Sequence, residues 1–142
     1  MSILVVDASV AIKWFVPEVH SAEAIRWRNG PDELHVPAVF FELEFANILW
    51  KKIRRTEITR LEADEIFAEL AVLPLIRHPE SPLILPAFEL ADRYQRSVYD
   101  ALYLALADQL NGQMLTADQR LINALAGTLI SNLVRHVTDS PP

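Results

Sequence analysis

A short apolar segment near the start of the chain constrains the fold more than any other feature. Residues 3–6 read Ile-Leu-Val-Val, and three of these four side chains are β-branched. Such a run is typical of a strand buried on both faces, as in a parallel sheet. Asp7 follows at once, so its carboxylate would lie at the carboxyl edge of the sheet, where open α/β folds bind ligands. Ser9 is then the expected N-cap of an apolar helix.

Strand and helix patterns alternate along the rest of the chain, which predicts a parallel sheet with helices on both faces. Thr59 and Glu62 form a capping-box pattern that predicts a helix start. We find no repeat or flexible linker, and therefore expect a single domain over residues 1–142. The further strands expected are 34–36, 72–76, 114–116 and 134–137, and the further helices are 21–28, 38–55, 60–71, 81–96, 99–110 and 118–126.

Composition excludes several classes of protein. The chain has no cysteine, which rules out disulfide frameworks, thiolate zinc sites and cysteine nucleophiles and suits the reducing cytoplasm. Neither a signal peptide nor an apolar run long enough to span a membrane is visible. The net charge of −6, from 19 acidic and 13 basic side chains, argues either against nucleic acid or for acids gathered at a metal site.

Four acids stand out from those on ordinary solvated faces. Asp7, Asp100 and Asp118 each lie at the beginning of an expected helix, where an acid is also a normal cap or first-turn residue. Glu44 lies inside a helix, away from both ends. Asn47 follows it by three residues, shares its face and is placed to hold the carboxylate by a hydrogen bond.

Convergence of these acids at one edge would require a cation. Four carboxylates would otherwise repel one another strongly. Carboxylate oxygens suit Mg²⁺ or Mn²⁺, and one or two such ions activate water and stabilise the leaving oxygen of a phosphodiester. The four histidines show no metal-ligand spacing. The pattern therefore favours nuclease chemistry if the acids meet.

Four segments of the chain resemble the PIN-domain family, and more closely the VapC-type toxin ribonucleases of type II toxin–antitoxin systems. They read VVDASVAIKWFVPE, VPAVFFELEFANILWKK, SVYDALYLALADQL and LTADQRLINA, and they extend over nearly the whole sequence. The resemblance implies a PIN-like α/β/α sandwich with a short-stranded, mostly parallel central sheet. It also implies a metal-dependent endoribonuclease that cuts single-stranded regions of RNA by in-line attack of a water activated by Mg²⁺ or Mn²⁺.

The resemblance assigns roles to particular positions. It implies that the acids are both catalytic and metal-binding, that small polar residues support them, and that a VapB-type antitoxin holds the protein inactive. The resemblance also implies a homodimer, which the apolar helix surface of so small a chain would suit. The acidic positions are Asp7, Glu44, Asp100 and Asp118, and the supporting positions are Ser9, Asn47 and Thr116.

Basic residues and competing functions complete the interpretation. Lys13, Lys51, Lys52 and Arg55 are possible RNA contacts, although each also suits an ordinary solvated helix position. A receiver-type signalling domain would need a further Asp on a middle strand, and phosphatase-type hydrolases carry an acid where Ser9 stands. A catalytically silent PIN-like RNA-binding or interaction module remains the alternative, and such a module is expected to lack one or more of the acids.

Overall fold

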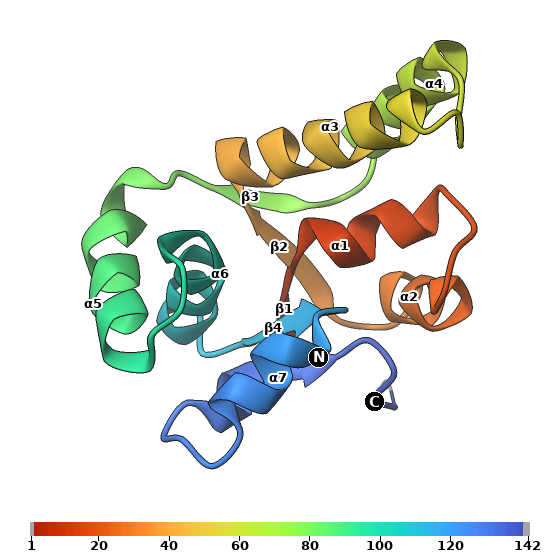
Figure 1. Ribbon diagram of the computed structural model, residues 1–142. Helices are drawn as coiled ribbons and strands as arrows, with labels where there is room; N and C mark the ends of the chain where they lie inside the picture. Colours follow the sequence, from red (N-terminus) through yellow and green to blue (C-terminus); the bar gives the residue numbers. More distant parts are fainter. Residues whose placement is uncertain (1, 141–142) are drawn as a thin grey trace.

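A five-stranded parallel sheet forms the centre of the protein (Figure 1). The computed structural model describes residues 2–140. The strands lie in the order β3-β2-β1-β4-β5, and every neighbouring pair is parallel. β1 is therefore the middle strand. The bounds are β1 (Ile3–Val6), β2 (Glu33–Pro37), β3 (Ile76–His78), β4 (Gln113–Thr116) and β5 (Val134–His136).

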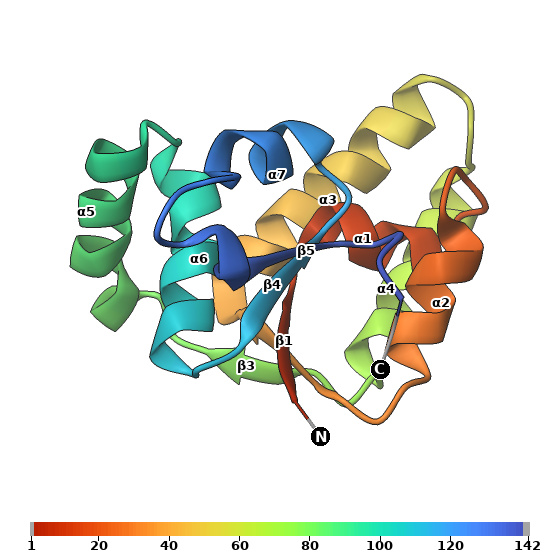
Figure 2. The ribbon, with the colours of Figure 1, turned by 90° about the horizontal axis from the view of Figure 1, so that it is seen from below.

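Helices cover both faces of this sheet. Figure 2 shows α5, α6 and α7 on one side and α1, α2 and α4 on the other. No helix of residues 2–140 is both long and apolar enough to cross a membrane. The bounds are α1 (Ala8–Ala11), α2 (Ser21–Arg28), α3 (Ala38–Arg54), α4 (Arg60–Ala71), α5 (Ile84–Tyr94), α6 (Val98–Gln109) and α7 (Gln119–Leu125), with short 3₁₀ turns η1 (Ile12–Trp14), η2 (Ser81–Leu83) and η3 (Ser131–Leu133).

The side chains of β1 alternate between two hydrophobic cores. Leu4 and Val6 join the core formed with α1, α2, α3 and α4. Val5 points to the opposite face and joins the core formed with α5, α6 and α7. This alternation is the two-residue period of a strand, and here both faces are buried. The predicted α/β sandwich with a parallel sheet is confirmed.

Helix α3 connects the two cores. Its residues Phe41, Phe45 and Leu49 are buried in the first core, whereas Phe40 packs against the second. Glu44 lies one turn after Phe40 on the same side of the helix. Packing of Phe40 therefore brings the middle of α3 close to α6.

The strand predicted over residues 72–76 is wrong, because β3 begins only at Ile76. Val72 is 82% exposed, and the chain from there to Leu75 forms a turn and an irregular segment. Leu73 and Leu75 pack against the first core from this irregular segment. Pro74 between them has no N–H to give to a neighbouring strand. The other predicted elements are present with ends shifted by a few residues.

Candidate active site

Asp7 and Thr116 meet where β1 and β4 end. The Asp7 N–H donates to the Leu115 carbonyl at 3.1 Å, continuing the ladder between these neighbouring strands. The Thr116 hydroxyl donates to Asp7 Oδ2 at 2.9 Å, and the Ser9 N–H donates to Asp7 Oδ1 at 3.0 Å. Both carboxylate oxygens of Asp7 are thus held by its neighbours. Thr116 therefore contacts the carboxylate that the sequence analysis expected it to support.

The N-cap of the first helix is Asp7, so the prediction that Ser9 caps it is wrong. Asp7 has extended backbone angles and its side chain accepts the Ser9 N–H, which is the geometry of a cap. Ser9 lies inside α1, and its hydroxyl accepts the Ala117 N–H at 3.4 Å. Ser9 therefore links α1, which follows β1, to the segment that follows β4.

Asp118 caps α7 and lies at the exposed edge of this group. Its Oδ1 accepts the Arg120 N–H at 2.9 Å, and its own N–H donates to the Thr116 hydroxyl at 3.1 Å. The same Thr116 hydroxyl donates to Asp7. Thr116 thus connects the backbone of Asp118 with the carboxylate of Asp7.

Glu44 faces α6 and accepts a hydrogen bond from the hydroxyl of Tyr103 at 2.5 Å. The predicted hydrogen bond between Asn47 and Glu44 is not formed; Asn47 is exposed. The neighbouring acid Glu42 is also exposed, and its Oε1 is 2.7 Å from Nη1 of Arg77. Glu44, rather than Glu42, is therefore the acid of α3 that faces the other site residues.

Asp100 lies in the first turn of α6, where Ser97 is the N-cap and accepts the Asp100 N–H at 3.1 Å. Its side chain is half-buried. Burial raises the pKa of Asp100, the negative charge of Asp118 adds to this increase, and Arg96 and Ser97 oppose it. Asp100 is thus an acid in the first turn of a helix, which was one of the two interpretations of its position in the sequence. It is also close enough to Asp118 to be affected by its charge.

Three carboxyls from different elements affect one another's ionisation. Burial raises the pKa of Asp7, against the hydrogen bonds from Ser9 and Thr116, and the charge of Asp100 raises it further. Burial likewise raises the pKa of Glu44 to about 7, with the charges of Asp7 and Asp100 acting in the same direction. Like charges act in this way only over short distances. Asp7 after β1, Glu44 on α3 and Asp100 on α6 are therefore neighbours in the folded protein.

The donor atoms at this place fit a hard divalent cation. They are carboxylate and hydroxyl oxygens, the ligands that Mg²⁺ and Mn²⁺ take in proteins. Within residues 2–140, however, no three His, Asp or Glu side chains stand close enough together to hold one ion. The chemistry of these residues fits such an ion, although their side-chain positions in the described part of the chain do not form a three-ligand centre.

A cavity of about 510 Å³ opens beside Ser9 and Asp118. Lys13 and Lys52 line it and bind the same acid: Lys13 Nζ is 3.0 Å from Glu18 Oε1, and Lys52 Nζ is 2.8 Å from Glu18 Oε2. The lysine side chains are only 11% and 13% exposed. Neither lysine is an ordinary solvated residue, because both are fixed by Glu18.

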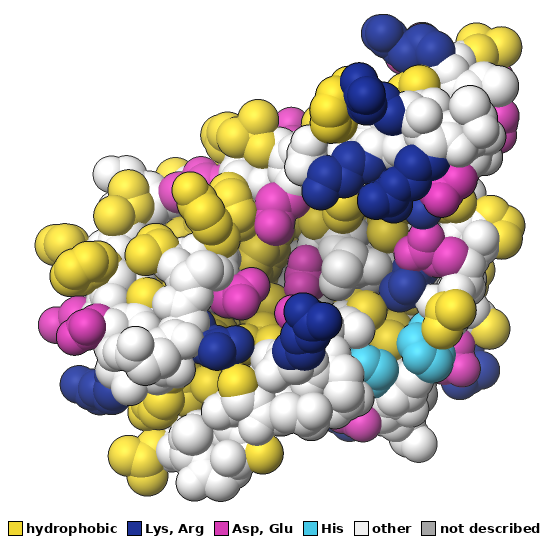
Figure 3. Space-filling model, viewed as in Figure 1, with side chains coloured by type: hydrophobic (Ala, Val, Ile, Leu, Met, Phe, Trp, Pro, Cys, Tyr) yellow, Lys and Arg dark blue, Asp and Glu magenta, His cyan; other side chains and the backbone are white. Residues whose placement is uncertain are grey.

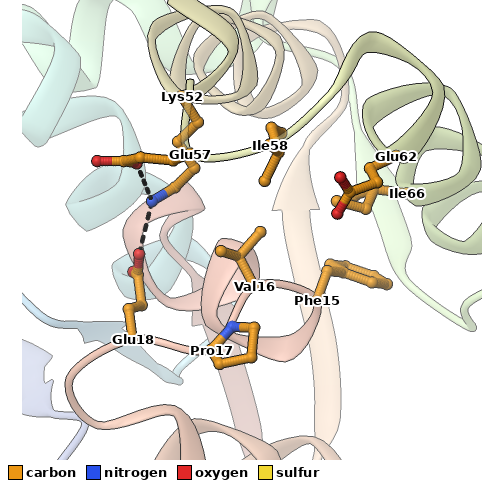
Figure 4. A pocket seen from close by; sticks show the side chains of 9 residues that line it. All are labelled: Phe15, Val16, Pro17, Glu18, Lys52, Glu57, Ile58, Glu62 and Ile66. Carbon is orange, nitrogen blue, oxygen red and sulfur yellow. Dashed lines mark hydrogen bonds and ion pairs between the residues drawn. The ribbon is translucent and has the colours of Figure 1, made fainter. Parts of the chain in front are cut away.

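A second cavity, of about 500 Å³, lies on the other side of this ion-paired group (Figure 4). Lys52 also approaches Glu57 at 3.4 Å, and the resulting row from Glu18 through Lys52 to Glu57 stands at one side of the cavity. Its lining is partly apolar and partly acidic. The lining residues are Phe15, Val16, Pro17, Glu18, Lys52, Glu57, Ile58, Glu62 and Ile66.

Acidic and basic side chains are arranged differently on this face of the molecule. Figure 3 shows acidic side chains around a hollow near the middle of the face, and Lys and Arg side chains over the C-terminal half of α3. Lys51 and Arg55 are exposed there. They follow Glu44 by 7 and 11 residues and so share its side of the helix, about two and three turns further on.

Tyr103 and Glu18 are the site residues that the sequence analysis missed. Tyr103 lies in a run of buried residues, 101–107, where an aromatic side chain suggests only core packing. Its spacing of three residues from Asp100 was an available signal, because it places the hydroxyl near the same side of the helix. Glu18 follows Pro17 in a loop, and no sequence pattern indicates that it joins Lys13 to Lys52.

Comparisons with known proteins agree with this geometry. The family model described as "PIN domain" matches residues 4–126. The chain is 38% identical to "Ribonuclease VapC3" of Pyrobaculum aerophilum over 120 residues, which is 83% of this chain and 91% of that protein. It is 31% identical to "Ribonuclease VapC3" of Mycobacterium tuberculosis over 121 residues, 85% of this chain and 86% of the relative.

Two solved structures share the fold. The crystal structure of PAE2754 from Pyrobaculum aerophilum superposes with a TM-score of 0.63 at 20% identity, covering 96% of this chain and 84% of the other. A toxin-antitoxin complex from Klebsiella pneumoniae gives a TM-score of 0.60 at 15% identity, covering 96% and 99%. With the domain match and the curated relatives, these results show that the chain belongs to the PIN-domain family, among its VapC proteins.

Proposed function

We propose that this protein is the endoribonuclease toxin of a type II toxin–antitoxin pair and that it requires Mg²⁺ or Mn²⁺. One observation carries the proposal: Asp7, Glu44 and Asp100 come from three different elements, each is partly or wholly buried, and the charge of a neighbouring acid raises the pKa of each. Acids gathered in this way lower the stability of a fold unless they have a ligand to bind. The names of the VapC relatives agree with ribonuclease activity.

In this proposal Asp7, Glu44 and Asp100 hold the ion, with Asp118 completing the site from the exposed side. When bound, a divalent cation lowers the pKa of water and offsets charge on the phosphodiester. Thr116 and Ser9 keep the Asp7 carboxylate in one orientation through their hydrogen bonds. Since Asn47 forms no hydrogen bond with Glu44 among the described residues, we do not retain it as a support for that acid.

RNA would enter from the basic side of the face. Lys51 and Arg55 are exposed on the side of α3 that carries Glu44, so they would bind phosphates of the strand beyond the site. Lys13 and Lys52 line the cavity beside Asp118, where Glu18 fixes their positions. The ordered Lys13 and Lys52 would orient the RNA backbone near the acids. The exposed Lys51 and Arg55 would supply most of the affinity for RNA.

The test is cleavage of single-stranded RNA by the purified protein with Mg²⁺, with Mn²⁺ and with EDTA. We expect cleavage with either metal, none with EDTA, and a loss of at least about 100-fold in Asp7→Asn. Glu42→Gln is the matched control, because Glu42 is an exposed acid on α3 paired with Arg77. Wild-type protein that binds RNA but cuts none with either metal would instead establish the silent-module alternative.

An antitoxin partner follows from the same proposal. A segment of that partner with apolar and basic side chains would suit the second cavity, where Phe15 and Ile66 are accompanied by the acids Glu57 and Glu62. Expression without a partner is expected to stop growth and degrade RNA, and expression of Asp7→Asn is not. Growth unaffected by the wild-type protein would refute the toxin role. The cytoplasm stays the predicted compartment.

A homodimer is the other assembly that we propose. Ile84, Leu85 and Phe88 expose between 54% and 75% of their surface on α5, and Val39 and Leu43 are similarly exposed on α3. Apolar surface of this kind is typical of association sites. Light scattering is expected to give twice the mass of one chain for the wild type and a monomer for Phe88→Asp. A monomeric wild type would exclude the dimer.

A further inference from the structure

The hydroxyl of Tyr103 connects the helix that carries Asp100 with the helix that carries Glu44. It donates to Glu44 Oε1 at 2.5 Å, across 59 residues of sequence. Hydrogen bonds to a carboxylate at this length are of the strong, charge-assisted kind. Tyr103 is the sole hydrogen-bond partner of the Glu44 side chain among residues 2–140, so Oε2 is left without a donor there.

Packing fixes the position of this hydroxyl. Tyr103 is 2% exposed, and its ring lies against Phe40 with 5.8 Å between centroids. Phe40 also stacks on Tyr99, one turn before Tyr103, at 5.4 Å with an interplanar angle of 11°. Phe40 and Glu44 are one turn apart on α3. The same helix therefore supplies both the ring that holds Tyr103 and the acid that Tyr103 binds.

The hydroxyl also lies close to the end of β1. The backbone of Ala8, the residue after Asp7, lowers the pKa of Tyr103 by hydrogen bonding. Burial acts more strongly in the opposite direction, and the charges of Asp7 and Glu44 add to it, so the pKa of Tyr103 is raised. A phenol in this environment keeps its proton and acts as a donor. It binds the Glu44 carboxylate without adding a charge.

We infer that Tyr103 is a positioning residue that turns Glu44 toward Asp7, holding one oxygen of the carboxylate and leaving the other free for the metal. The inference rests on the proposed function. A glutamate side chain loses considerable rotamer freedom on being ordered, and a site that has already ordered it binds its ligand more tightly. Loss of such an orienting partner typically lowers metal affinity by 10- to 100-fold.

The test compares Tyr103→Phe with Tyr99→Phe by calorimetric titration of metal-free protein with Mn²⁺. Both changes remove one hydroxyl from α6 and keep the ring, and both rings contact Phe40. Tyr99 is 66% exposed, and its hydroxyl forms no hydrogen bond within residues 2–140. We expect Tyr103→Phe to bind Mn²⁺ about 10- to 100-fold more weakly, and Tyr99→Phe to bind it within about twofold of the wild type.

A second measurement separates positioning from general stability. Mn²⁺ raises the melting temperature of a protein that binds it when folded, by an amount set by its affinity. This rise is expected to shrink in Tyr103→Phe and to stay unchanged in Tyr99→Phe, whatever the melting temperatures of the metal-free proteins. The double variant Tyr103→Phe/Glu44→Gln should bind Mn²⁺ no more weakly than Glu44→Gln alone. Tyr103 acts only through the Glu44 carboxylate, so its hydroxyl has nothing further to contribute once that carboxylate is replaced.

The outcomes separate this inference from the proposed function. Normal or tighter Mn²⁺ binding by Tyr103→Phe, together with weak binding by Asp7→Asn and Glu44→Gln, overturns the role of Tyr103 and leaves the metal site intact. Normal binding by all three variants overturns the metal site and the role of Tyr103 with it. Weak binding by all three supports both.

Discussion

Replacing Glu44 by Gln should make the metal-free protein more stable at neutral and alkaline pH. Glu44 is a partly buried carboxyl whose pKa is raised from 4.5 to about 7 in the folded state. Between these values the folded protein binds more protons than the unfolded chain, so this group makes stability fall as the pH rises. Gln removes the charge and retains an oxygen that accepts the Tyr103 hydroxyl.

The size of the effect follows from the pKa difference. A shift of about 2.5 pH units corresponds to about 3 kcal/mol at pH 8, and screening of this partly exposed group by solvent reduces the expected gain to about 2 kcal/mol. Below pH 4.5 the group is protonated in both states, and the gain should approach zero. A gain of this size would raise the melting temperature by about 4–8 °C in a domain of this length.

The assay is urea unfolding in EDTA at several values between pH 4.5 and pH 8. Glu42→Gln is the control, and its stability should stay within about 0.5 kcal/mol of the wild type, because Glu42 is an exposed partner of Arg77. A gain in Glu44→Gln that does not change with pH, or a loss of stability at pH 8, would refute the reasoning. Either result would mean that the Glu44 carboxylate is well solvated or well paired in the folded protein.

Two further substitutions test the packing of the sheet and the path of RNA. A Cβ at Gly112 would lie 2.5 Å from the Ile3 carbonyl oxygen, so Gly112→Ala should lose about 2 kcal/mol in urea unfolding. Gly30→Ala, where the nearest atom would be 3.4 Å away, should change little; equal effects would contradict the close approach. In Asp7→Asn protein, adding Lys51→Ala should reduce the salt dependence of RNA binding by about one unit of slope, and Arg60→Ala should not.

The sheet was predictable because two of its three inner strands, β1 and β4, carry strong local signals. β1 is wholly apolar and β4 has Met114 and Leu115 at its centre. An acid and a helix start follow each strand, and such patterns depend on neighbours in sequence. The segment around Pro74 was not predictable in this way. Leu73 and Leu75 pack against the core from an irregular segment. A run of apolar residues in such a segment cannot be distinguished by sequence alone from a buried strand.

The contacts between acids and their partners were harder to predict. Glu44 stands out in the sequence because it lies inside a helix, and Asn47 is the expected partner because it follows by three residues on the same face. The actual partner, Tyr103, lies on another helix, and only the packing of Phe40 against α6 brings the two together. The helix cap was expected at Ser9, two positions after the actual cap Asp7, because both residue types are good caps and only backbone geometry distinguishes them.

The strand order has a consequence for synthesis of the protein. β1 is made first, yet it pairs with β4, more than 100 residues later in the chain, and Thr116 at the end of β4 holds the Asp7 carboxylate. At translation rates of roughly 5–20 residues per second, about 5–20 s separate the two residues on the ribosome. During that interval Asp7 lacks the hydroxyl that orients it, and β1 lacks one of its two neighbours. The acidic centre therefore assembles only after β4 has been made, and fragments that end before β4 cannot form it.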